Sequence, residues 1–226
     1  QDVHQWRLDR LEEGVTPQTL NRDRTSLLAL LNQAVEWKLL SANPLEDPVI
    51  KPLETSDDKR VRWLGQHDEH EDIRDGNGGQ LGERARFIAA LSDKETPKYL
   101  HQLCIIAMNT GMRRGEIFKL KWKDVSIDRA EVILRAATTK ANKPRHIPLN
   151  ADVIAVLKEL GKLRHISGYV FINPDTNAPF TTFKRSWSSL VTRAQLSDFT
   201  FHDLRHDFAS RLVQAGVNLY EVKDLL

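Results

Sequence analysis

Residues 97–120 read PKYLHQLCIIAMNTGMRRGEIFKL, and the rest of the chain can be interpreted outward from this stretch. Apolar side chains lie on most sides of the segment 97–109, which predicts a helix at the centre of a hydrophobic core. Gly111 follows at once and is typical of a helix end. A further short helix is expected at 114–120, with a pair of arginines at its start.

The segments on either side predict a mainly α fold with a small three-stranded antiparallel β-sheet, an α+β class. Stretches rich in β-branched residues and separated by turns predict strands at 122–127, 131–137 and 145–148. Apolar residues at helical spacing predict helices at 3–13, 17–40, 82–92, 151–163, 181–194, 202–215 and from 218 onward. Thr16 and Pro17 suit the cap and first turn of the second of these helices.

The chain is expected to have two parts joined by a linker. Residues 47–61 contain two prolines and many charges without periodicity, which favours an extended linker. Residues 62–226 then form the larger domain. Residues 1–46 offer only two helices, too few to bury an independent core. We therefore interpret them as the C-terminal part of a small helical domain.

Composition sets broad limits on the function. The 33 basic and 31 acidic residues give a net charge of +2, so total charge does not identify a nucleic-acid-binding protein. Basic residues gather at 113–123, 140–145 and 184–193, where they would follow a phosphate backbone if they lay on one surface. A solvated surface is the alternative interpretation of the same charges.

Several cellular settings are disfavoured by the sequence. No apolar run approaches the roughly 20 residues of a membrane helix, and the start lacks a signal-peptide pattern. The single cysteine, Cys104, excludes an internal disulfide and is expected to be a buried core thiol. A cytoplasmic protein without membrane partners fits these features.

Two motifs carry residues suited to phosphate chemistry. In TGMRRGE, residues 110–116, two arginines stand at a helix start, and Glu116 lies one turn after Arg113, where it can hold that guanidinium. In FHDLRHDFAS, residues 201–210, His202 and Arg205 are three apart and can face one target. Histidine moves protons near neutral pH and arginine binds anions.

A lysine completes the candidate set. Lys140 stands at a predicted hairpin tip, from which it can reach into a groove, although a turn lysine is more often merely solvated. His67 and His70 lie in the acidic segment 66–80, which we interpret as a solvated loop and not a metal site. Sequence motifs for nucleotide, dinucleotide, hydrolase or zinc-protease chemistry are absent. The residues predict phosphoryl transfer without a metal or other cofactor.

These motifs, in this order and spacing, resemble the tyrosine recombinase family in its phage-integrase branch, from about Arg62 to Leu226. The resemblance implies that Arg113, Lys140, His202 and Arg205 are catalytic, with Glu116 as support and Lys143 as second choice for the lysine. It implies a nucleophilic tyrosine, a 3′-phosphotyrosine intermediate, and site-specific recombination or integration. It also implies that residues 17–44 end a core-binding domain.

The resemblance further implies double-stranded DNA with attachment-type sites as the partner, a homotetramer on DNA, and a bacterial host's cytoplasm. We expect phosphate contacts from a group of basic residues: Arg22, Arg24, Lys119, Lys121, Lys143 and Arg145. The sequence departs from the family pattern at Asp207, where a small hydroxyl residue is usual, which affects helix capping or a phosphate contact. The acidic loop 66–80 is also longer than expected.

The chain is expected to stop before the nucleophilic tyrosine. Tyr220 falls too soon after Arg205 for that role, and packing is the preferred interpretation of its side chain. An inactive chain is therefore expected when it acts alone. The alternatives are a non-cleaving sequence-specific DNA-binding regulator of the same fold, a type IB topoisomerase, and a protein-binding helical domain.

Overall fold

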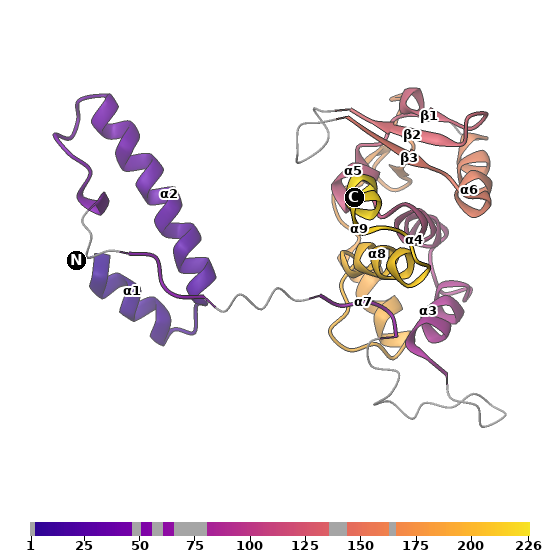
Figure 1. Ribbon diagram of the computed structural model, residues 1–226, viewed down its shortest axis with the longest axis horizontal. Helices are drawn as coiled ribbons and strands as arrows, with labels where there is room; N and C mark the ends of the chain where they lie inside the picture. The colour runs from indigo at the N-terminus through magenta and orange to yellow at the C-terminus, as the bar shows by residue number, and fades with distance from the viewer. Residues whose placement is uncertain (1–2, 47–50, 56–60, 66–80, 136–143, 163–165) are drawn as a thin grey trace. The chain divides into compact units, whose positions relative to one another are not determined.

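The computed structural model describes residues 3–46, 51–55, 61–65, 81–135, 144–162 and 166–226. The chain separates into two compact units, residues 1–60 and residues 61–226, which are described one at a time (Figure 1). None of the described helices combines the length and apolar character needed to cross a membrane.

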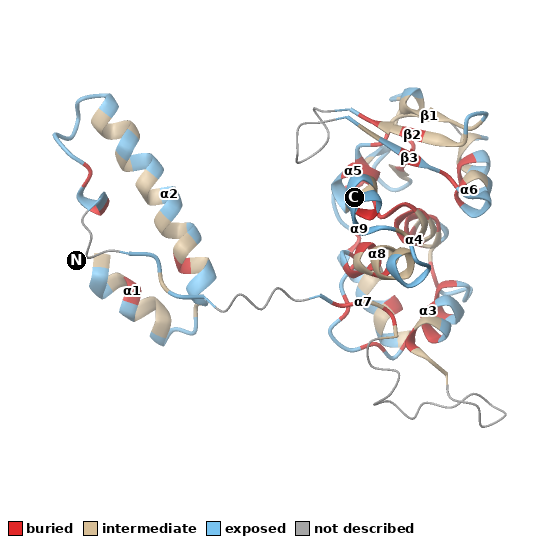
Figure 2. Ribbon diagram, viewed as in Figure 1, coloured by how far each residue is buried: buried red, intermediate tan, exposed pale blue. Residues whose placement is uncertain are grey.

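The first unit contains helices α1 (Val3–Glu12) and α2 (Pro17–Glu36) and a 3₁₀ turn at Pro44–Glu46. The Thr16 hydroxyl caps α2 by accepting from the Thr19 N–H, as the sequence predicts. The helix ends at Glu36 and not at residue 40, because Lys38 takes a left-handed conformation with φ 58°. Few side chains of this unit are buried (Figure 2).

Residues 51–55, which the sequence assigns to the linker, are bonded to both helices of the first unit. Arg7 donates from Nη1 to the carbonyl oxygen of Lys51 at 3.0 Å. The Asn21 amide donates to the Leu53 carbonyl at 2.8 Å and accepts from the Leu53 N–H at 2.7 Å. This segment therefore belongs to the helical unit.

The second unit is built around α4 (Lys98–Thr110), which packs against α6 and α8, while α3 packs against α7. Gly111 ends α4 in the left-handed conformation with φ 61°. The other helices of the unit are α3 (Glu83–Leu91), α5 (Arg114–Phe118), α6 (Ala151–Gly161), α7 (Lys184–Arg193), α8 (Asp203–Gln214) and α9 (Leu219–Leu225).

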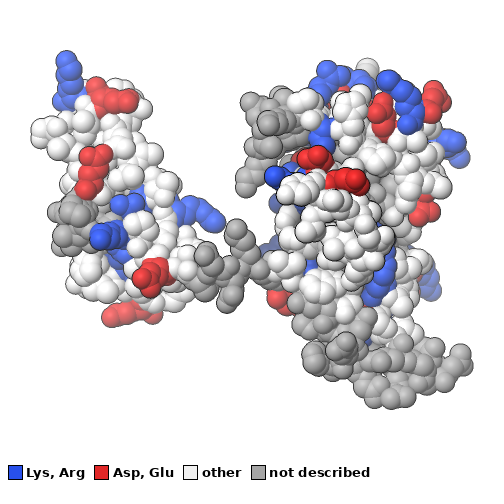
Figure 3. All heavy atoms as spheres, in the orientation of Figure 1, with Lys and Arg blue, Asp and Glu red and all other residues white. Residues whose placement is uncertain are grey.

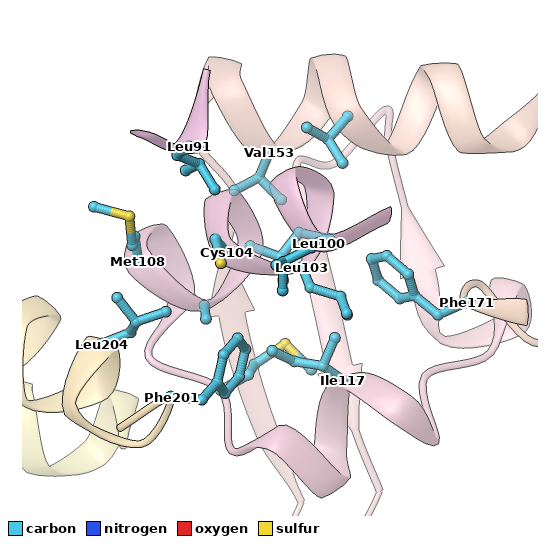
Figure 4. Close-up of a cluster of buried hydrophobic side chains, with 14 of the residues drawn as sticks. Leu91, Leu100, Leu103, Cys104, Met108, Ile117, Val153, Phe171, Phe201 and Leu204 are labelled. Atoms are coloured by element: carbon cyan, nitrogen blue, oxygen red, sulfur yellow. The ribbon is translucent and has the colours of Figure 1, made fainter. Parts of the chain in front are cut away.

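Side chains of α4 form the middle of the core (Figure 4). Leu100, Leu103 and Cys104 have no exposed surface. In the close-up Val153 lies on one side of them, and Ile117 lies on the other side. The prediction of a central helix and a buried thiol is confirmed, and burial raises the pKa of the Cys104 thiol above its ordinary value.

A three-stranded antiparallel sheet forms from β1 (Val125–Ser126), β2 (Glu131–Leu134) and β3 (Arg145–Pro148) in that order. The prediction of a strand over 122–127 is wrong for its first three residues, because Trp122–Asp124 forms a 3₁₀ turn. The register places Leu134 opposite Arg145. A second pair, β4 (Ile172–Asn173) with β5 (Ala178–Pro179), was not predicted.

A buried ion pair fixes the start of the second unit. The Arg62 and Glu83 side chains expose 3% and 0% of their surface, and Arg62 Nη1 lies 2.8 Å from Glu83 Oε2. The same carboxylate oxygen accepts from the Gly65 N–H at 2.8 Å. The Arg62 guanidinium lies 5.4 Å from the centroid of the Phe199 ring. Residues 61–65 are thereby held against α3.

Candidate phosphate-binding site

Glu116 fixes Arg113 at the start of α5. Its carboxylate accepts from the Arg113 backbone N–H at 2.8 Å and from Arg113 Nη1 at 3.0 Å. This is the carboxylate half of a capping box, in which the third helical residue reaches back to the cap. Glu116 is 3% exposed, whereas the Arg113 side chain is 36% exposed. The buried Glu116 carboxylate therefore holds the arginine, while part of the arginine side chain faces solvent. Arg114, the other member of the pair, is exposed.

Arg205 reaches the same place from α8. Its Nη1 donates to the Gly111 carbonyl oxygen at 2.6 Å, so the side chain lies against the C-terminal end of α4. A cation is favourable there because the last carbonyl groups of a helix lack partners and carry partial negative charge. Gly111 has no side chain to obstruct this approach. Gly111 ends α4 with a φ of 61°, and the hydrogen bond from Arg205 to its carbonyl links this end of α4 to α8.

Three guanidinium groups converge on a single oxygen. Arg113 Nη1 lies 3.4 Å from the backbone oxygen of Leu226, and Arg145 Nη1 and Arg205 Nη2 donate to the same oxygen. They line a cleft of about 930 Å³ that also includes Pro144, His146, Leu219, Val222, Lys223 and Asp224. Guanidinium donors from α5, β3 and α8 therefore meet in one cleft, where they share an acceptor oxygen.

Burial and neighbouring positive charges lower the pKa values of two of these arginines. The pKa of Arg205 is lowered to about 10, first by burial and then by the cations of Arg113 and Arg145, with Glu116 opposing the shift. The pKa of Arg145 is lowered by burial, while Glu116 acts in the opposite direction. Both groups stay charged at neutral pH, and their mutual repulsion favours a bound anion.

His202 stands at the N-cap of α8, just before the helix that carries Arg205. The turn is fixed by Asp203, whose carboxylate accepts from the Thr200 N–H at 2.6 Å and from its hydroxyl at 2.8 Å. His202 is exposed as a whole residue, and the centroid of its ring lies 5.0 Å from that of His206. Burial of part of the ring, then His206 and then Arg205, lower the pKa of His202. A neutral imidazole is therefore favoured.

The remaining predicted basic residues are spread more widely. Lys140 and Lys143 lie outside the described residues. Lys119 is exposed, and the Lys121 ammonium lies 4.6 Å from the centroid of the Tyr169 ring. Arg22 and Arg24 are on α2 of the first unit. In the view of Figure 3, basic side chains are interspersed with acidic ones on the face shown.

None of the three tyrosines of the sequence lines the cleft. The Tyr99 hydroxyl is 2.7 Å from the Ser186 hydroxyl, and the Tyr169 ring faces Lys121. Tyr220 is 79% exposed, so the interpretation of its side chain as packed is wrong. It stands at the N-terminal end of α9, where its backbone N–H donates to the Asn218 side-chain oxygen at 2.9 Å.

Asp207 has a role that the sequence did not indicate. It is 1% exposed, and its Oδ2 pairs with Arg84 Nη1 of α3 at 2.5 Å and with Arg211 Nε at 3.3 Å. Its side chain thus fastens α8 to α3 and neither caps a helix nor lines the cleft. Only the spacing to Arg211, one turn further on, was visible in the sequence.

No three His, Cys, Asp or Glu side chains of the described ranges are grouped as metal ligands. The histidines of the acidic loop, His67 and His70, lie outside those ranges.

Similarity to known proteins extends over most of the chain. The model of the phage integrase family matches residues 82–226. The integrase of Salmonella phage P22 is 31% identical over 208 residues, covering 87% of this chain and 47% of the phage protein. The shufflon-specific DNA recombinase of Escherichia coli is 29% identical over 215 residues, with 94% and 48% covered. The chain spans about half the length of these relatives.

Solved structures share the fold. The Tn1549 transposon integrase in complex with circular intermediate DNA has a TM-score of 0.63 at 22% identity, covering 98% of this chain and 74% of that one. A lambda integrase dimer bound to a COC′ core site has a TM-score of 0.64 at 18% identity, covering 96% and 73%. The predicted mainly α fold of a tyrosine recombinase catalytic domain is confirmed. From the match over residues 82–226 and the likeness to the P22 protein, the chain belongs to the phage integrase family of tyrosine recombinases.

Proposed function

We propose that this chain supplies the phosphate-activating part of a site-specific DNA recombinase or integrase. The observation that carries the proposal is that Arg113, Arg145 and Arg205 line one cleft, with Glu116 holding both Arg113 and Arg145. Donors fixed in place before the reaction stabilise the charge that develops on the non-bridging oxygens of a phosphate in phosphoryl transfer. Family membership makes a DNA phosphodiester the substrate we assign.

The proposed reaction exchanges one phosphate ester for another. A tyrosine hydroxyl gives up its proton and its oxygen forms a bond to phosphorus, the bond to the 5′ oxygen breaks, and the leaving oxygen takes a proton to become a 5′-hydroxyl. His202 and Lys140 are the groups we assign to proton transfer, and Glu116 supports Arg113. The guanidinium groups supply the positive charge that the transition state needs, so the proposal requires neither a metal nor a cofactor.

We assign the nucleophile to none of the tyrosines in this sequence. Tyr99 and Tyr169 are engaged elsewhere, and Tyr220 does not line the cleft. The proposed division of roles is that the chain binds and activates the phosphate while the attacking tyrosine comes from outside these 226 residues. On this proposal the chain alone does not cleave DNA.

Double-stranded DNA with attachment-type sites is the proposed partner. Relatives of this fold have been solved in complex with DNA, which supports the assignment. We propose backbone phosphate contacts from Arg22, Arg24, Lys119, Lys121 and Lys143. Residues 1–46, with the attached segment 51–55, act as the end of a core-binding domain, the remainder of 47–61 connects it to the second unit, and residues 62–226 act as the catalytic domain. We also propose a homotetramer on DNA in the cytoplasm of a bacterial host; relatives from a Salmonella phage and Escherichia coli support the bacterial setting.

The test combines DNA binding with strand cleavage by the full-length protein on duplexes that it selects from a random pool. Arg113→Gln and Arg205→Gln are expected to lower the rate of covalent adduct formation by about 10²-fold to 10³-fold, because each removes a donor to the transition state. DNA binding should survive in part and weaken with rising salt. Lys158→Gln removes the same charge from an exposed position on α6 and serves as the control. Unchanged cleavage in both arginine variants would contradict the site assignment.

A non-cleaving DNA-binding regulator of the same fold is the second candidate. The observation in its favour is that no tyrosine of the sequence lines the cleft. The two candidates separate in one experiment: sequence-selective, salt-dependent DNA binding without any covalent adduct from the full-length protein supports the regulator.

A further inference from the structure

Arg145 occupies a different place from the other basic residues named as flanking DNA contacts. It begins β3 opposite Leu134 of β2, and its side chain is 11% exposed. By contrast, Lys119 is exposed, and Lys121 stands over the Tyr169 ring. Arg145 lines the cleft together with Arg113 and Arg205. Its burial sets it apart from a lysine or arginine that meets a passing phosphate on an open surface.

The Arg145 guanidinium has two partners on two different nitrogens. Nη2 lies 3.0 Å from Glu116 Oε2, the same carboxylate that holds Arg113 through its other oxygen. Nη1 donates to the Leu226 backbone oxygen, on which Arg113 and Arg205 also converge. One end of the fork is therefore braced by the carboxylate, and the other end is aimed at the point of convergence.

The charges around this point are unbalanced. Three guanidinium groups meet there, and Glu116 is the carboxylate that pairs with Arg113 and Arg145. The Nε atom of Arg145 is buried without a hydrogen-bond partner among the described residues. Buried charge is costly unless it is paired, and like charges held together lower one another's affinity for protons. An anion at the point of convergence relieves both penalties.

We propose that Arg145 is a third arginine ligand of the reacting phosphate, equal in kind to Arg113 and Arg205. This inference rests on the proposed function, since it takes the anion to be a DNA phosphate. In the cleft that the three arginines line, Arg145 Nη1 donates to a non-bridging phosphate oxygen while Glu116 holds Nη2. Arg145 thus connects the phosphate to β3, the strand that directly follows the segment containing Lys140.

Lysine cannot replace arginine in this arrangement. The two partners of Arg145 are reached by separate nitrogens of a rigid planar fork, whereas an ammonium offers one nitrogen at the end of a flexible chain. A lysine at this position keeps the positive charge but serves Glu116 or the phosphate, not both in the observed geometry. Charge alone and forked geometry are therefore separable by substitution.

The test measures binding of inorganic phosphate to the full chain by calorimetry, with Arg145→Gln and Arg145→Lys compared with Arg205→Gln. Each arginine donates a charge-assisted hydrogen bond, so each of the three variants is expected to weaken phosphate binding about tenfold or more. Lys158→Gln, which removes an exposed charge on α6, is expected to leave the affinity unchanged. Phosphate-induced shifts of the Arg145 side-chain NMR signals in the unsubstituted protein give a second readout that does not depend on a variant's folding.

Each result has a definite meaning. Loss in Arg205→Gln with wild-type affinity in both Arg145 variants overturns the inference and leaves the proposed function intact. Loss in Arg145→Gln with full affinity in Arg145→Lys overturns the forked role, because charge alone then suffices. Wild-type affinity in all three variants, with no shift of the Arg145 signals, rejects the phosphate site itself and the proposed function with it.

Discussion

At the residue scale, the site depends on partners that are distant in sequence. Glu116 holds Arg113 three residues before it and Arg145 twenty-nine residues after it. The first contact follows from helical spacing and was predicted. The second depends on the strand register that sets Arg145 opposite Leu134, which no local pattern reveals. For the same reason the sequence placed Arg145 among flanking phosphate contacts and not inside the cleft.

The pairing of two histidines leads to a prediction about protonation. His206 is the second cause, after burial, of the lowered pKa of His202, so His206→Gln should raise that pKa toward its ordinary value of 6.5. An NMR titration of the His202 ring measures it, with His101→Gln on α4 as the control expected to change nothing. An unchanged His202 pKa in His206→Gln would contradict the coupling.

The same shift sets a direction for stability. The pKa of His202 in the folded chain lies below that of the unfolded chain, so the unfolded state binds more protons between the two values. The stability linked to His202 is therefore fully present above about pH 6.5 and is lost as the pH falls through the folded-state pKa. His206→Gln should flatten this dependence in urea unfolding followed across that window.

At the element scale, helices with a long apolar pattern and a clear cap were predicted correctly, whereas short strands and one helix end were not. The apolar segment of α4, ended by Gly111, and the Thr16–Pro17 start of α2 gave correct helices. Trp122–Asp124 was predicted as strand but forms a 3₁₀ turn. The strands β4 and β5 have two residues each, too few to show an alternating apolar pattern. The end of α2 was predicted too late, because the left-handed residue that follows the helix is Lys38 and not a glycine, the residue that usually marks such an end.

Gly111 connects two elements of the site, and a substitution tests that connection. A Cβ atom at Gly111 would lie 2.6 Å from Phe208 Cδ1 and 2.6 Å from Leu226 Cδ2, on a backbone with φ 61°. Gly111→Ala should therefore lower the free energy of unfolding by about 2 to 4 kcal/mol, from backbone strain and overpacking.

Gly115→Ala is the matched control, because a Cβ atom there meets nothing within 4 Å and lies inside α5. It should be neutral or stabilise by up to about 1 kcal/mol. Urea denaturation compares the two variants, and equal stability would show that the end of α4 adapts freely.

At the scale of the whole molecule, residues 1–60 and residues 61–226 are separate compact units and should respond separately to damage. Glu83→Gln leaves the buried Arg62 cation unpaired and should destabilise the second unit by about 3 to 5 kcal/mol. Hydrogen exchange followed by mass spectrometry reads both units in one sample, and protection should fall across α3, α4, α7 and α8 but not across α1 and α2.

Glu159→Gln makes the same chemical change in the exposed Lys98–Glu159 pair, where side chains are 72% and 45% exposed. Its effect on stability should be small beside that of Glu83→Gln, because solvent screens an exposed ion pair. Loss of protection in the first unit after Glu83→Gln would mean that the two units unfold together.

The one thiol of the chain sits at the centre of α4, without exposed surface and with its ionisation suppressed by burial. The thiolate is the nucleophile that attacks a thiol reagent, and the reagent must first reach it, so Cys104 reacts only while the core is open. The rate at which Cys104 is modified in the native chain therefore reports how often the core opens. Because no second cysteine of the chain competes for the reagent, this rate can be measured without any substitution.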